Sequence, residues 1–152
     1  MKKDVYLKIA EQTSAFNPAE IEILDEVLTD CFEDPKTTYI LFEEKNNDRL
    51  LGFVIFGRSP ITKFSWDIYW MVVDKEFQRK GIGKKLQKRI ESYVLLQDKK
   101  ANLIIETSSK PEYNATRNFY KNSGFKEVGQ IPDFYNENDS LIIFYKCFNT
   151  LK

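Results

Sequence analysis

Residues 67–84 read Asp67-Ile68-Tyr69-Trp70-Met71-Val72-Val73-Asp74-Lys75-Glu76-Phe77-Gln78-Arg79-Lys80-Gly81-Ile82-Gly83-Lys84. The first half is apolar, β-branched and aromatic, which is typical of a buried strand. The second half is basic and contains two glycines. Apolar residues then recur at the spacing of one helical face, at Ile82, Leu86, Ile90 and Val94. The pattern predicts a buried strand, a short polar loop and an amphipathic helix in succession.

The first turn of that helix is suited to binding an anion. Its backbone N–H groups have no intrahelical partner and lie at the positive end of the helix dipole. Gly81 would let an anion approach the backbone closely, while Arg79, Lys80 and Lys84 add positive charge. We expect this turn to bind a phosphate or a pyrophosphate. The alternative is an ordinary strand–turn–helix connection with a solvated basic rim.

The spacing of the glycines separates the known kinds of phosphate loop. A Walker loop needs a hydroxyl residue after Gly83-Lys84, and a Rossmann turn needs a third glycine; both are missing. The pattern Gln78-x-x-Gly81-x-Gly83, after a strand that ends in Val-Asp, resembles the acetyl-CoA-binding motif of the GNAT superfamily of N-acetyltransferases. The resemblance implies that the coenzyme pyrophosphate binds the loop residues Gln78, Arg79, Lys80, Gly81, Ile82, Gly83 and Lys84.

A second stretch, residues 113–125, resembles another GNAT motif, N-x-x-A-x-x-x-Y-x-x-x-G-F. Tyr120, Gly124 and Phe125 match in register, whereas the asparagine, Asn114, lies one residue later than the family places it. The resemblance implies that Tyr120 is the general acid that protonates the departing coenzyme A thiolate. It also assigns coenzyme contacts to Asn114 and Arg117. The structural alternative for Tyr120 is a tyrosine packed between neighbouring phenylalanines.

Composition limits the classes of function. The 152 residues suit a single domain, residues 1–152, and the charge balances to zero, so we expect neither a nucleic-acid nor a membrane partner. No apolar run approaches membrane-spanning length and the N-terminus does not resemble a signal peptide, which favours a cytoplasmic protein. The chain has no histidine, so histidine bases and most zinc sites are excluded, and no metal is expected.

The remaining segments alternate between strand and helix patterns. We predict helices over residues 17–34, 82–96 and 114–122, and strands over residues 5–10, 38–44, 50–56, 67–73, 103–107, 125–128 and 141–148. The segment from Ile131 to Asp139 is expected to be a long polar and aromatic loop. A short turn at residues 13–16 or 32–36 would replace the second early helix that the family usually has.

This order predicts an α+β, three-layer fold. Its sheet is mixed and mostly antiparallel, with six to seven strands and helices on its faces. A strand–helix–strand order implies a right-handed crossover, so residues 67–73 and 103–107 should form a central parallel pair. The GNAT fold has this layout, and the resemblance implies that this pair splays apart at its C-terminal end.

The resemblance also implies a mechanism. Backbone groups of Met71, Val72 and Val73 would pair with the pantetheine arm, and one N–H group, of Val72 or Val73, would polarise the thioester carbonyl. Asp67 and Glu106 are rival general bases for the acceptor amine, with Tyr69 or water alone as further possibilities.

The acceptor is a primary amine of unknown identity. Neither motif contains a cysteine, which favours direct attack in a ternary complex over a covalent acetyl-enzyme. The alternatives are a non-catalytic module that binds acyl-CoA as a sensor, and a phosphate-binding protein unrelated to coenzyme A. The chain is expected to be a monomer or a homodimer.

Overall fold

The computed structural model of the chain describes residues 2–149 and contains one six-stranded sheet of order β1-β2-β3-β4-β6-β5. The pairs β1–β2, β4–β6 and β5–β6 are antiparallel, and β3–β4 is parallel. Its elements are α1 (Asp4–Gln12), α2 (Pro18–Glu33), β1 (Ile40–Asn46), β2 (Arg49–Arg58), β3 (Ser65–Val73), the 3-10 turn η1 (Lys75–Phe77), α3 (Ile82–Gln97), β4 (Lys100–Ser108), the 3-10 turn η2 (Pro111–Tyr113), α4 (Asn114–Asn122), β5 (Lys126–Asn136) and β6 (Asp139–Asn149). The mixed sheet, its parallel pair and its helices confirm the predicted fold class.

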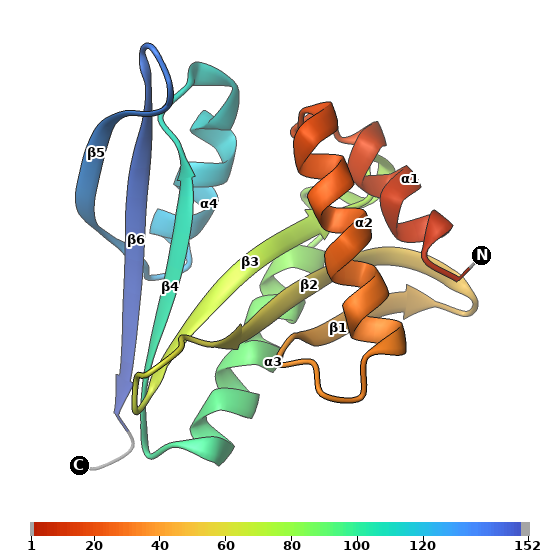
Figure 1. Ribbon diagram of the computed structural model, residues 1–152, viewed down its shortest axis with the longest axis horizontal. Coiled ribbons are helices and arrows are strands. Elements are labelled where there is room, and N and C mark those ends of the chain that lie inside the picture. The colour runs from red at the N-terminus through yellow and green to blue at the C-terminus, as the bar shows by residue number, and fades with distance from the viewer. Residues whose placement is uncertain (1, 150–152) are drawn as a thin grey trace. The chain divides into compact units, whose positions relative to one another are not determined.

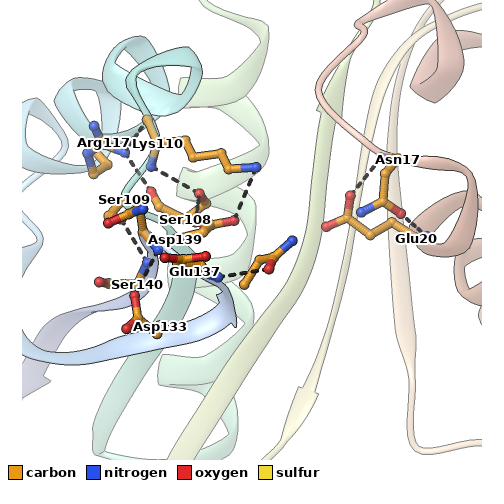
Figure 2. Close-up of polar contacts among 12 residues, drawn as sticks. Asn17, Glu20, Ser108, Ser109, Lys110, Arg117, Asp133, Glu137, Asp139 and Ser140 are labelled. Carbon is orange, nitrogen blue, oxygen red and sulfur yellow. Dashed lines mark hydrogen bonds and ion pairs between the residues drawn. The ribbon is translucent and has the colours of Figure 1, made fainter.

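The chain forms two compact units: one comprises residues up to Gly57 and Trp70–Ser92, and the other comprises Arg58–Tyr69 and residues from Tyr93 onward. In the first unit, α1 and α2 pack on the β1–β2 hairpin (Figure 1). The centre of this core is Phe53, whose ring meets that of Tyr6 edge-on at 5.2 Å. Asn17 and Glu20 form a reciprocal capping box at the start of α2 (Figure 2).

The second unit contains β4, β5, β6, α4 and the start of β3 (Figure 1). The long β4–β6 ladder runs from the Lys100–Asn149 pair to the Ser108–Leu141 pair. Trp66 is buried at the start of β3, where its indole N–H donates to Asp98 at 3.1 Å. The parallel β3–β4 register ends at Ile68 and Ile105, although β3 continues to Val73 and β4 to Ser108.

The prediction of a strand over residues 5–10 is wrong, because this segment lies in α1. Its buried residues are Tyr6, Ile9 and Ala10, which are spaced as on one face of a helix. A strand would have buried Val5 on the same face as Leu7, but Val5 is 45 % exposed. Two helices therefore precede β1, so neither short turn has to replace a helix.

The prediction of a long loop at residues 131–139 is also wrong, because β5 extends to Asn136 and β6 begins at Asp139. Every residue from Ile131 to Asn138 is exposed, so the segment shows none of the apolar alternation that marks a half-buried strand. Its register to β6 is irregular between Ile131 and Asn136. The two strands form a hairpin whose turn is Glu137–Asn138.

Candidate functional site

The loop that follows β3 has the backbone geometry of an anion site. The φ angle is +61° at Arg79 and +83° at Gly81, whereas Lys80 between them has a negative φ. Such alternation turns successive N–H groups toward one side of the chain, forming a concave nest for an anion. The first helical hydrogen bond of α3 runs from the Lys85 N–H to the Gly81 carbonyl, so the earlier amides lie ahead of the helical ladder.

The side chains of this loop place positive charge at its rim. Arg79, Lys80 and Lys84 are all exposed. Gln78, the first residue of the motif, donates from its side-chain amide to the Val73 carbonyl at 3.2 Å. This bond links the last residue of β3 to the loop.

The turn between β3 and the loop is held by ionic contacts that the motif did not reveal. Asp74 is 5 % exposed, and it accepts hydrogen bonds from the Glu76 N–H at 3.0 Å and from the Arg49 guanidinium at 3.2 Å. Arg49 also donates to Glu76 at 2.5 Å. The hydrogen bond to Glu76, and to a smaller extent the one to Asp74, raises the pKa of Arg49 above its ordinary value, so the guanidinium stays charged.

The end of β3 and the start of α3 approach β2 closely at Gly52. A Cβ on Gly52 would lie 2.8 Å from the Val72 carbonyl oxygen and 3.0 Å from the Ile82 side chain. Val72 and Ile82 are buried, while Met71 and Val73 are half-buried. The first unit thus contains all of the predicted pantetheine and pyrophosphate residues on one packed strand–loop–helix segment.

Tyr120 lies in the second unit, on α4. Its side chain is buried, and its ring packs against Phe125 at 5.9 Å and Phe144 at 5.7 Å. Burial raises its pKa to about 12, so the phenol stays protonated at neutral pH. The packing that we offered as the structural alternative is therefore present, and it leaves the hydroxyl in the protonated form that a proton donor needs.

The side chains of Asn114 and Arg117 form hydrogen bonds within the second unit. Arg117 donates to the carbonyl of Ser108 at 2.5 Å, to that of Lys110 at 2.9 Å and to the Asn114 side chain (Figure 2). The guanidinium thereby ties the end of β4 to the first turn of α4. A direct coenzyme contact by Arg117 would have to compete with these bonds.

Buried polar groups reinforce the same region. The Ser108 hydroxyl donates to Asp139 on β6, and the Lys110 ammonium lies 3.7 Å from the other oxygen of Asp139 (Figure 2). The Ser140 N–H donates to the Ser109 hydroxyl at 2.8 Å. Nothing in the local sequence signals this network, because its members are about 30 residues apart and meet only through the β4–β6 pairing.

The candidate bases share one face of the second unit's sheet. Asp67 is in register with Ile104, two residues before Glu106, so their side chains point to the same side. Asp67 accepts a hydrogen bond from the Ser59 hydroxyl at 2.6 Å, and Glu106 is exposed. Tyr69 follows Asp67 on this face and is 43 % exposed.

Tyr120 packs on the opposite face of that sheet. It contacts Phe144, which is in register with Ile105 and therefore points away from the side of Ile104 and Glu106. The second unit thus separates the proposed acid from the candidate bases by one layer of sheet.

The comparisons with known proteins identify the family. The family model described as an acetyltransferase (GNAT) domain matches residues 35–127, which is more than half of the chain. The chain belongs to the GNAT acetyltransferase family, whose general reaction is acetyl transfer from acetyl-CoA. No curated protein matches the sequence.

Solved structures share the fold over nearly the whole chain. A GNAT-family protein from Desulfovibrio desulfuricans is 27% identical, with 96% of this chain and 93% of that chain covered and a TM-score of 0.87. An aminoglycoside 6'-N-acetyltransferase complexed with coenzyme A is 18% identical, with 95% and 89% covered and a TM-score of 0.72. The ribosomal-protein-S18-alanine N-acetyltransferase from Escherichia coli is 17% identical, with 100% and 92% covered and a TM-score of 0.72.

No group of three or more cysteine, aspartate or glutamate side chains in residues 2–149 is arranged to hold a metal ion. Within the same residues, no helix is long and apolar enough to cross a membrane.

Proposed function

We propose that the chain is an N-acetyltransferase that moves the acetyl group of acetyl-CoA to a primary amine by direct attack in a ternary complex. The observation that carries the proposal is the anion nest at Arg79–Gly81, which lies between β3 and α3 within the residues that the family model matches. Its amides and the charges of Arg79, Lys80 and Lys84 suit the diphosphate of coenzyme A.

Each step of the reaction has a candidate group. The neutral amine attacks the thioester carbonyl, and the N–H of Val72 or Val73 stabilises the oxyanion of the tetrahedral intermediate. Collapse of that intermediate breaks the carbon–sulfur bond, and the thiolate accepts a proton from Tyr120. The proton lost by the amine passes to Asp67, to Glu106 or to water.

The residue types of the two motifs support direct attack. Deprotonation of an incoming amine and protonation of a leaving thiol are assigned to different groups, and no acetylated residue is needed between them. Neither motif contains a cysteine that could carry the acetyl group.

The acceptor is either a small-molecule amine or a protein amine. The solved relatives include an enzyme named for aminoglycosides and one named for the alanine of a ribosomal protein, so the shared fold accommodates both classes. We therefore propose the class of acceptor, an amine, and leave its scaffold to experiment.

The test is acetyl-CoA turnover with a panel of amines, measured through the release of free thiol. The panel should contain polyamines, amino sugars, amino acids and peptides with a free N-terminus or a lysine. We expect thiol release with at least one acceptor, and mass spectrometry of the product should show one added acetyl group. Binding of acetyl-CoA without turnover across the panel would favour the acyl-CoA sensor. Stabilisation by ATP or NAD but not by coenzyme A would refute both readings.

A further inference from the structure

Arg49, at the start of β2, contacts the turn between β3 and the anion nest, although 24 residues separate the two in sequence. One of its terminal nitrogens bridges Asp74 at 3.2 Å and Glu76 at 2.5 Å. Its guanidinium carbon lies 4.5 Å from the centre of the Phe77 ring. The Lys80 ammonium lies 5.0 Å from the centre of the same ring. Arg49 and a basic residue of the nest therefore contact one aromatic side chain.

The two carboxylates oppose the binding of a diphosphate to the loop. Asp74 and Glu76 lie three to five residues ahead of Arg79, and each carries a negative charge that would repel an incoming anion. Asp74 cannot simply move into solvent, because it is 5 % exposed and caps η1 through the Glu76 N–H. A buried carboxylate of this kind needs a charged or hydrogen-bonding partner.

We propose that Arg49 is a positioning residue for the coenzyme diphosphate, an inference that rests on the proposed function. Its single positive charge offsets one of the two negative charges on Asp74 and Glu76, and its contact with the Phe77 ring holds the side chain that Lys80 also contacts. The β2 strand thereby sets the electrostatic potential of a loop that belongs to the β3–α3 connection. Arg49 acts through the loop and is assigned no contact with the thioester or the acceptor amine.

Arg89 provides a matched control within the same unit. It pairs with Glu44 at 3.2 Å and lies 4.7 Å from the centre of the Phe42 ring, and its side chain is 46 % exposed against 53 % for Arg49. Both arginines thus combine one aromatic contact with an acidic partner on a similarly exposed surface. Only Arg49 joins carboxylates that adjoin the nest, so only its loss should weaken binding of the coenzyme.

The test is calorimetric titration of acetyl-CoA into the wild type, Arg49→Gln, Arg89→Gln and the double variant Arg49→Gln/Glu76→Gln. We expect Arg49→Gln to raise the Kd about fivefold at low salt and Arg89→Gln to leave it unchanged, since an exposed ion pair has an effect of this order. The double variant should regain most of the affinity, because the net charge of these three side chains, which falls from −1 to −2 in Arg49→Gln, returns to −1. Raising the salt concentration should shrink the difference between wild type and Arg49→Gln.

The outcomes separate this inference from the proposed function. A wild type that binds neither acetyl-CoA nor inorganic pyrophosphate overturns the proposed function and this inference with it. A wild type that binds, with Arg49→Gln equal to it or with no recovery in the double variant, overturns the inference alone. Thermal unfolding of each variant without coenzyme separates a loss of fold from a loss of affinity. A Kd ratio that is unchanged by salt would show that Arg49 acts by support of the backbone and would also overturn the charge argument.

Discussion

Replacing Gly81 by alanine tests whether the nest binds the coenzyme. The φ angle of +83° at this residue lies in the region that L side chains avoid, and an alanine there costs about 1–2 kcal/mol. The added Cβ would meet no atom within 4 Å, so no steric clash adds to this cost. Alanine also restricts the unfolded chain, which offsets roughly 0.4–1 kcal/mol. We expect a net loss of about 1 kcal/mol, which lowers the Tm by about 2–4 °C in a chain of this length.

The effect on the coenzyme should be larger than the effect on stability. The Cβ position of Gly81 has no atom within 4 Å, so an added methyl group would occupy open space beside the amides of the nest. A methyl group there would hold a diphosphate away from the amides of the nest. We expect the Kd for acetyl-CoA to rise at least tenfold, which corresponds to about 1.4 kcal/mol of lost binding free energy.

Gly124→Ala is the control for backbone strain. Gly124 has a φ of +89° after the end of α4, and its added Cβ would lie 3.1 Å from the flexible Lys146 side chain. Both variants should therefore unfold at similar temperatures in differential scanning calorimetry. Calorimetric titration should then show weaker binding of acetyl-CoA for Gly81→Ala alone. Equal affinities in the two variants would refute the assignment of the nest as the diphosphate site.

Four further predictions rest on contacts of single side chains. Tyr120→Phe should lower kcat about 100-fold with little change in the KM for acetyl-CoA, because it removes one oxygen from a packed ring; unchanged turnover at every pH would exclude the acid role. Burial raises the pKa of Tyr120 to about 12 in the fold, so its protonated form stabilises the protein fully below about pH 10. About 3 kcal/mol of the free energy of unfolding is then lost as the pH rises toward 12. Urea denaturation at several pH values should show a smaller loss of stability in Tyr120→Phe than in the wild type. If Asp67 or Glu106 is the base, Asp67→Asn or Glu106→Gln should lower kcat/KM at neutral pH, and wild-type rates in both variants would leave Tyr69 or water as the acceptor of the proton. Asn17→Ala should cost about 1 kcal/mol of stability through loss of the capping box and leave the Kd for acetyl-CoA unchanged, as thermal unfolding and titration would show.

The parts of the fold that the sequence predicted well are those with local signals. The N-cap Asn17 and the C-cap Asp34, which precedes a proline, bound α2 at the limits of the helix predicted over residues 17–34, and Gly124 follows the end of α4 with a positive φ. The β3–loop–α3 segment was also predictable, because its apolar run, glycines and helical stripe occupy adjacent positions. Each of these signals depends only on residues within one turn or strand of one another.

The errors arose where burial depends on distant residues. The segment of residues 4–12 is short, and its apolar residues suit either a helix or a strand. It forms α1 because its buried side chains pack against α2 and β2. β5 is an edge strand with one neighbour, so its exposed tip shows no alternation. Arg49 carries no motif at all, because its role depends on pairing with carboxylates about 25 residues later.

The pKa of Tyr120 limits what the residue can do as an acid. A phenol with a pKa of about 12 transfers its proton uphill to an ordinary thiolate, whose conjugate acid has a pKa of roughly 8.5, at a cost of about 5 kcal/mol. A thiolate released against the same buried surface would be desolvated as well, and desolvation raises its pKa too. The difference in pKa therefore shrinks as the carbon–sulfur bond breaks. In the proposed reaction, Tyr120 would therefore donate a hydrogen bond to the developing thiolate and complete the proton transfer only as the thiol departs.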